Sequence, residues 1–260
     1  MTNAKFANET FLAIASAENA KDLWDVWRRQ MARFGFDRCL YGFSFYTSVR
    51  TGHLGAETDF IIFSNHDKEY LDAYFKDLQI KHAPLINWAM RNTGAISWAE
   101  IQRVSKELND PKALEVMKTN ERFGVLTGYT VSFKSVSERA RGAISLCAKP
   151  GLSQQDVEDI WISNGETIVS ICNFAHLKML TLPLGLYQSS LLTPKQREVL
   201  EWTADGKTLS EISEILGKSQ TMIEKHLRNA RNALNVVTTA QAVLKAMQLN
   251  QLFLPEDADK

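Results

Sequence analysis

Three closely spaced helix-start signals in the last quarter of the chain constrain its fold more than any other feature. Thr193 offers an N-cap hydroxyl, a proline follows at the first helical position and a glutamine stands at the third. Thr208 repeats this capping box with a glutamate three residues on. Gly217 can end the short second helix, and the hydroxyl of Ser219 can cap a third. The sequence therefore predicts a helix, a tight turn and a helix in succession.

The predicted third helix, which runs to about residue 234, has one apolar and one polar face. Its apolar residues recur at i, i+4, i+7 and i+11 and therefore share one side: Ile223, Leu227, Ala230 and Leu234. The polar side carries Thr221, Glu224, Lys225, Arg228 and Arg231. Such groups suit phosphate oxygens and base edges when a helix enters the major groove. We therefore expect these five residues to bind double-stranded DNA, with Arg228 gripping a guanine through two hydrogen bonds.

A fourth helix is predicted after Thr238, because Gln241 stands at its third position and completes another capping box. This helix is expected to expose the apolar residues Val243, Leu244, Met247 and Leu249. Some of them are candidates for a contact between two copies of the chain, which predicts a homodimer.

Charge and composition limit where such a protein can act. The 30 basic and 30 acidic residues cancel, so no global positive field attracts nucleic acid and any DNA contact has to be local. No apolar run approaches the roughly 18 residues that cross a bilayer, and the N-terminus does not resemble a signal peptide. We therefore expect a cytoplasmic protein that binds no membrane. Cys39, Cys147 and Cys172 are widely spaced and odd in number, which predicts buried thiols.

The chain length of 260 residues predicts two domains. Residues 182–191 contain Pro, Gly and Ser without helical or strand periodicity, which is typical of a linker. This places a sensor domain at residues 1–181 and the helix-turn-helix domain at residues 192–260.

The first domain alternates helical and strand-like segments. Apolar periodicity predicts helices at residues 8–17, 20–34, 67–75, 84–91, 111–122 and 153–180. Strands are predicted at residues 38–45, 59–64, 126–133 and 143–148. Because helices bracket the strands at both ends, we expect an α+β protein: an N-terminal α/β/α sandwich with a mostly antiparallel sheet, followed by an all-α domain of four helices.

The C-terminal quarter resembles the DNA-binding domain of LuxR-type regulators. The resemblance covers about residues 190–250 and rests on the runs at 192–200, 205–208, 211–212, 215–217 and 224–227. In that family the residue aligned with Glu224 is commonly basic. An acidic side chain there suggests a different operator, since a carboxylate can accept a hydrogen bond from the amino group of cytosine.

The N-terminal domain more loosely resembles the signal-binding domain of LuxR-type quorum-sensing receptors. The resemblance is carried by spacing, at Tyr70, Tyr74, Pro84, Trp98, Gly128 and Ser145. It implies an aromatic-walled pocket for an acyl-homoserine lactone. By contrast, the alternating strands and acidic pair of a receiver domain are missing.

Two positions depart from the receptor pattern. Tyr70 stands where a tryptophan usually donates to the lactone carbonyl, and Ala83 stands where an aspartate usually accepts from the ligand amide. Leaving that amide donor unpaired costs roughly 1–3 kcal/mol, or about tenfold or more in affinity. We therefore expect Tyr70, Tyr74, Ala83, Trp98 and Ser145 to line a pocket that binds a standard acyl-homoserine lactone weakly and prefers another small amphipathic signal.

The leading functional interpretation is a homodimeric regulator whose two recognition helices read the half-sites of an inverted repeat. The alternatives are a regulator that works without ligand and a dimerisation partner that sequesters a related receptor in heterodimers. An enzyme is not expected, because the sequence has no glycine-rich phosphate loop, no metal-spaced His/Cys set and no G-x-S-x-G motif. A small signal is the only bound cofactor that the resemblance implies.

Overall fold

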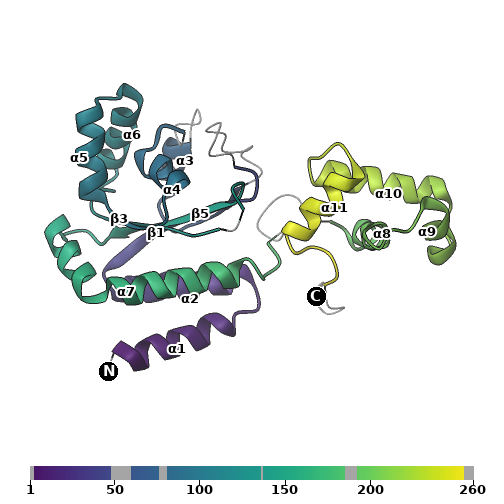
Figure 1. The fold of residues 1–260 in the computed structure, drawn as a ribbon, viewed down its shortest axis with the longest axis horizontal. Helices are drawn as coiled ribbons and strands as arrows, with labels where there is room; N and C mark the ends of the chain where they lie inside the picture. The colour runs from purple at the N-terminus through teal and green to yellow at the C-terminus, as the bar shows by residue number, and fades with distance from the viewer. Residues whose placement is uncertain (1–2, 48–59, 76–80, 136, 185–191, 255–260) are drawn as a thin grey trace. The chain divides into compact units, whose positions relative to one another are not determined.

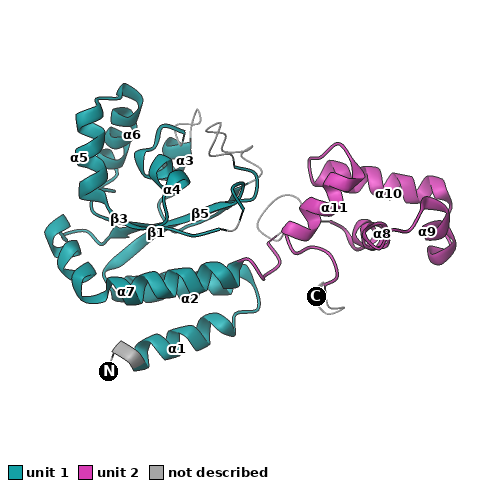
Figure 2. Cartoon of the chain, in the orientation of Figure 1, with its two compact units in different colours: residues 1–179 teal, residues 180–260 magenta. Residues whose placement is uncertain are grey.

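The computed structural model describes residues 3–47, 60–75, 81–135, 137–184 and 192–254. The chain forms two compact units, Met1–Met179 and Leu180–Lys260 (Figure 2). Most of the predicted linker, residues 185–191, lies outside the described residues. Its first residues belong to the second unit, since Leu182 and Leu184 are buried and the Leu184 amide donates to the Leu249 carbonyl.

Unit 1 is built on a five-stranded sheet in the order β2-β1-β5-β4-β3, in which every neighbouring pair is antiparallel. The strands are β1 (Phe36–Ser44), β2 (Phe60–Ser64), β3 (Gly94–Ser97), β4 (Gly128–Ser132) and β5 (Arg141–Ala148). All five residues of β4 are buried, so this strand is covered on both faces.

Helices cover both faces of the sheet (Figure 1). On one face lie α3 (Lys68–Phe75), α4 (Pro84–Arg91), α5 (Trp98–Leu108) and α6 (Pro111–Arg122). On the other lie α2 (Ala20–Arg33) and α7 (Gln154–Met179), with α1 (Asn3–Ala15) packed outside them. The predicted α/β/α sandwich is confirmed.

The face under α2 and α7 is filled by aromatic rings. The Tyr41 hydroxyl lies 2.9 Å from Nδ1 of His176, and Phe133 stacks on the same imidazole with 4.1 Å between ring centroids. Burial lowers the pKa of His176 to about 4, so the ring is neutral at ordinary pH. Trp27 packs edge-on against Tyr41 and is fully buried. The two cavities described below lie on the opposite face of the sheet.

The predicted elements of unit 1 are confirmed with boundary shifts of a few residues, but β3 and α5 were not predicted. The strand β3 has four residues and gains its hydrogen bonds only from β4. Its last residue, Ser97, accepts the Ala99 amide and so starts α5 directly. The four-residue strand β3 has no periodic pattern of its own, whereas α5 places Trp98, Ile101 and Leu108 at helical spacing and was predictable from the sequence.

Unit 2 contains α8 (Pro194–Ala204), α9 (Leu209–Leu216), α10 (Gln220–Ala233) and α11 (Thr239–Gln248). The capping boxes at Thr193, Thr208 and Thr238 are confirmed, and Ser219 caps α10. Gly217 ends α9 with φ of 59°, a left-handed conformation that glycine adopts without a Cβ penalty. The predicted all-α domain of four helices is confirmed.

The apolar face of α10 anchors it to its neighbours. Ile223, Leu227, Ala230 and Leu234 are all buried, and α10 packs on α8, α9 and α11. Of the four apolar residues expected to be exposed, Leu244 and Met247 are exposed and Val243 is half-buried. The expectation for Leu249 was wrong: it is buried, because the chain turns back into the unit there.

Two further observations concern the cysteines and the length of the helices. Cys39, Cys147 and Cys172 are free and buried, which confirms the prediction from their spacing. None of the helices in the described ranges combines the length and apolar character that a membrane span requires.

Candidate ligand pocket and nucleic-acid interface

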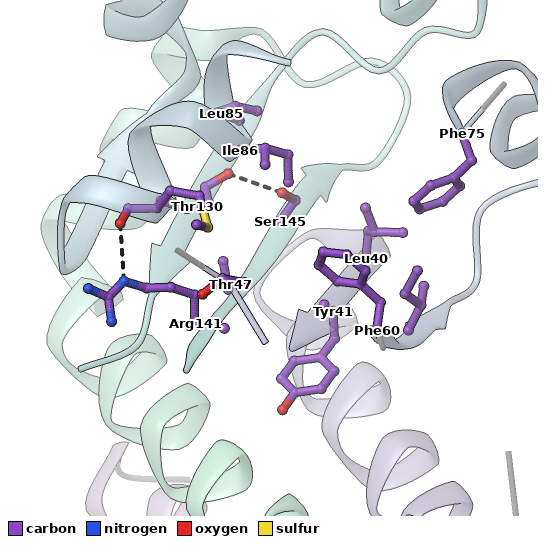
Figure 3. Close-up of a pocket in the computed structure, with 16 residues that line it drawn as sticks. Leu40, Tyr41, Thr47, Phe60, Phe75, Leu85, Ile86, Thr130, Arg141 and Ser145 are labelled. Atoms are coloured by element: carbon purple, nitrogen blue, oxygen red, sulfur yellow. Dashed lines mark hydrogen bonds between the residues drawn. The ribbon is translucent and has the colours of Figure 1, made fainter. Parts of the chain in front are cut away.

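A mostly apolar cavity lies between the sheet and the helices α3 and α4. It encloses about 650 Å³ of empty space, part of it open to solvent. Its walls include Leu40, Phe60, Phe75, Leu85 and Ile86, which Figure 3 shows around the sheet surface. Its mostly apolar lining suits an acyl chain or a similar apolar group.

The floor of this apolar cavity carries a short line of polar groups. Thr130 and Ser145 are cross-strand partners on β4 and β5, and their hydroxyl oxygens lie 3.1 Å apart (Figure 3). The indole Nε1 of Trp98 donates to the Thr130 hydroxyl at 3.0 Å. The chain Trp98–Thr130–Ser145 thus links the helical side of the pocket to the sheet. Thr130 was not singled out from the sequence, where a threonine in a strand reads as ordinary packing.

A second, more polar cavity lies beside the first, under α4, α5 and α6. It encloses about 1040 Å³ of empty space, part of it open to solvent, and Leu85 lines both cavities. Three predicted ligand residues, Tyr74, Ala83 and Trp98, line this second cavity, while Ser145 lines the first. The predicted pocket residues are therefore shared between two adjacent compartments.

Tyr70 belongs to the same buried cluster but points its polar group elsewhere. Tyr70, Tyr74, Ala83 and Trp98 pack together with Val116, Val125 and Cys147. The Tyr70 hydroxyl donates to Oδ1 of Asn120 at 3.0 Å, and Tyr70 is not among the described residues that line either cavity. The Tyr70 ring packs against the ring of Tyr74, with 5.4 Å between the two ring centroids.

The hydroxyl of Tyr74 is a buried hydrogen-bond donor beside the second cavity. Tyr74 is only 6% exposed, and within the described ranges its hydroxyl has no hydrogen-bond partner. Burial raises the pKa of Tyr74 far above its ordinary value, so the group stays protonated. It can therefore donate a hydrogen bond to an oxygen placed in the second cavity.

Ala83 provides no side-chain acceptor in this wall. It is the N-cap residue of α4, is 1% exposed, and makes no side-chain capping bond. Its carbonyl already accepts the amide of Asn87. In the described lining of the two cavities Glu121 is the only carboxylate, and it is exposed at the surface. Besides the Tyr74 hydroxyl, the side-chain oxygens in the described lining of the second cavity belong to Gln102, Asn120 and Glu121. The acceptor that is missing is therefore the one at position 83.

The exposed side of α10 is the candidate nucleic-acid interface. Of the five residues predicted to bind DNA, Thr221, Lys225 and Arg228 are exposed on the side opposite Ile223. Asn232 shares that side and is also exposed, although it is not among the five residues predicted to bind DNA. Its position follows from the helical period, since it lies seven residues after Lys225.

The other two predicted residues, Glu224 and Arg231, contact each other. Arg231 donates from Nη2 to Oε1 of Glu224 at 3.0 Å and from Nη1 to the Thr239 hydroxyl at 2.8 Å. The Arg231 side chain is 19% exposed and that of Glu224 is 51% exposed. Sequence periodicity placed both residues on α10 but gave no sign of the ion pair.

A domain with an internal cavity and a second domain with an outward-facing recognition helix define a sensor-type transcription regulator. Residues 19–179 match the family model of the autoinducer binding domain, and residues 190–246 match that of bacterial regulatory proteins of the luxR family. The chain therefore belongs to the LuxR-type regulators with an autoinducer binding domain, a family of transcription regulators and not of enzymes.

The chain is similar to a relative along nearly its whole length, and its fold is similar to that of solved structures. The transcriptional activator protein AnoR of Acinetobacter nosocomialis is 23% identical over 92% of this chain and 96% of AnoR. The structure of SdiA from Escherichia coli has a TM-score of 0.56 at 16% identity, covering 97% of this chain and 100% of SdiA. The N-acylhomoserine lactone dependent factor CepR2 of Burkholderia cenocepacia has a TM-score of 0.51 at 18% identity, covering 68% of this chain and 95% of CepR2.

Proposed function

We propose that this protein is a cytoplasmic, homodimeric transcription regulator whose N-terminal pocket binds a small amphipathic signal. The observation that carries the proposal is the apolar cavity of about 650 Å³ beside a polar one, in a chain whose second unit presents a recognition helix. The acyl part of the signal would occupy the apolar cavity, and its polar part would face Tyr74 in the second. Since AnoR is named a transcriptional activator, we propose that the regulation is activation.

The hydrogen-bonding groups of the pocket define the preferred signal. Tyr74 supplies a donor, whereas Ala83 supplies no acceptor. A ligand with carbonyl or ester oxygens satisfies such a wall, but a ligand with a buried amide N–H leaves that donor unpaired. We therefore propose an acyl compound without an amide donor. SdiA, which shares this fold, has been solved in complex with octanoyl-rac-glycerol, an acyl ester.

A substitution at Ala83 tests this assignment. The probes are N-octanoyl homoserine lactone and its ester analogue, in which oxygen replaces the amide N–H. The unmodified protein is expected to bind the ester more tightly, and Ala83→Asp is expected to raise the affinity for the amide about tenfold or more, because the carboxylate accepts a hydrogen bond from the amide N–H. Titration calorimetry on the full chain measures both constants.

Ala83→Asn serves as the second variant, because it offers an acceptor oxygen without burying a charge. It is expected to improve amide binding by less than Ala83→Asp. Tight binding of the amide by the unmodified protein would refute the inference drawn from Ala83, and failure of every acyl probe to bind would refute the signal pocket.

In the second unit we propose that Thr221, Lys225 and Arg228 contact DNA directly. Arg228→Ala is expected to relax the base preference at one position of each half-site, at a cost of about 1–3 kcal/mol on the preferred sequence. Lys225→Ala is expected to weaken binding evenly on all sequences and to lower the slope of affinity against salt by about 1. Fluorescence anisotropy on matched and mismatched duplexes separates the two. Uniform losses for both variants would contradict these roles.

A further inference from the structure

The ion pair on α10 lies where a recognition helix approaches base edges. Glu224 stands in the first half of α10 (Gln220–Ala233), and the N-terminal residues of such helices are those that contact bases. Arg231 follows seven residues later, so the two side chains share one flank of the helix. Their charged atoms meet at 3.0 Å.

Both terminal nitrogens of the Arg231 guanidinium donate hydrogen bonds within the protein. One nitrogen donates to Glu224 and the other donates to the hydroxyl of Thr239, the first residue of α11. Because Arg231 is 19% exposed and both of these contacts are internal, its side chain ties α10 to α11. This cation is therefore engaged within the protein and is not presented to a phosphate.

Glu224 gains a fixed orientation from this arrangement. Its Oε1 accepts from Arg231, while Oε2 makes no hydrogen bond in the described part of the chain. The side chain remains 51% exposed. Neutralisation by Arg231 also reduces the repulsion that an isolated carboxylate would feel near phosphates. A carboxylate with one oxygen clamped and the other open is prepared to accept a hydrogen bond.

We propose that Glu224 reads a cytosine in the major groove, accepting a hydrogen bond from its exocyclic amino group, and that Arg231 is the positioning residue that aims it. The proposal rests on the proposed DNA-binding function of α10. A carboxylate accepts from the cytosine amino group, whereas thymine and guanine present carbonyl oxygens that repel it. Adenine offers an amino group beside an acceptor nitrogen, so a carboxylate fits it less well than an amide does.

The test is a selection of binding sites from random duplexes with the full chain at low salt. The unmodified protein is expected to select cytosine at one position of each half-site. Glu224→Gln is expected to shift that position towards adenine, because an amide pairs with both edge atoms of adenine. The ratio of affinities for cytosine and adenine at that position should change at least tenfold.

Substitutions at Arg231 and Thr239 distinguish a positioning role of Arg231 from a purely structural one. Arg231→Met is expected to relax the same position while the salt slope of binding stays unchanged, because no phosphate contact is lost. Thr239→Val removes the link to α11 but keeps the ion pair. It should lower the melting temperature and leave the base preference intact.

Three outcomes would overturn the proposal. An unchanged base preference in Glu224→Gln would show that the pair only stabilises the fold. A salt slope lowered by about 1 in Arg231→Met would make Arg231 a phosphate contact. Selection of no sequence by the unmodified protein would remove the DNA-binding function itself, which distinguishes that failure from the other two.

Discussion

Leu227→Asp is expected to abolish DNA binding and to unfold the helix-turn-helix unit while unit 1 keeps its structure. Leu227 is 5% exposed, on the face of α10 that packs against its neighbouring helices. The substitution removes a buried leucine and places an unpaired charge in the same space, at a cost of about 4 kcal/mol or more. That is a large part of the stability of a small domain. Hydrogen exchange would show lost protection in α8–α10 and retained protection in the sheet.

Lys225→Asp is the matched control for this experiment. It introduces the same carboxylate on the same helix, but on the exposed side. The unit should stay folded, and binding to all duplexes should weaken because a cation near the phosphates has become an anion. If Leu227→Asp left the amides of α10 protected, then this helix would not depend on its apolar side for its position.

The helix-turn-helix unit was largely predictable because its determinants are local. Each capping box joins residues three positions apart, such as Thr208 and Glu211, and the buried side of α10 follows from the helical period. The partner of Arg231 was not predictable in this way. Its contact with Thr239 crosses the break between α10 and α11, and periodicity gives the face of a helix but not the direction of a side chain.

The pocket was predictable only in part, because its contacts join distant segments. The resemblance to the receptor family predicted that Tyr74, Ala83 and Trp98 line one pocket, and these three residues do line the second cavity. The hydroxyl of Tyr70, however, donates to Asn120, fifty residues further along the chain. The division into two cavities depends on how α4, α5 and α6 pack over the sheet, which no local pattern encodes.

The wall at Ala83 and the Glu224–Arg231 pair on α10 differ in chemistry, but the proposals for both depend on the cost of an unpaired hydrogen-bonding group. At Ala83 an acceptor is missing from a buried wall, so the ligand has to match the donors that remain. At Glu224 an acceptor is present and oriented on the surface, so the base has to supply a donor. In both proposals, recognition depends on whether a hydrogen-bonding group would be left unpaired.

Gly128→Ala is expected to destabilise unit 1 by about 3 kcal/mol and to remove ligand binding. A Cβ atom on Gly128 would collide with the backbone carbonyl of Leu146 on the neighbouring strand and would lie 3.2 Å from the Trp98 ring. Strand β4 would therefore have to move away from β5, and the Trp98 wall would move with it. Thermal unfolding and titration with the octanoyl ester measure the two effects.

Gly42→Ala is the control that reduces the space in the apolar cavity without disturbing the packing of the sheet. Gly42 also lies on the sheet, but a Cβ there meets no atom of the described residues within 4 Å, and the residue lines the apolar cavity. The added methyl group should leave the melting temperature nearly unchanged and should reduce the affinity for the octanoyl ester by filling space that the acyl chain uses. Unimpaired ester binding in Gly42→Ala together with a stable Gly128→Ala protein would mean that this surface of the sheet is not the floor of the ligand site.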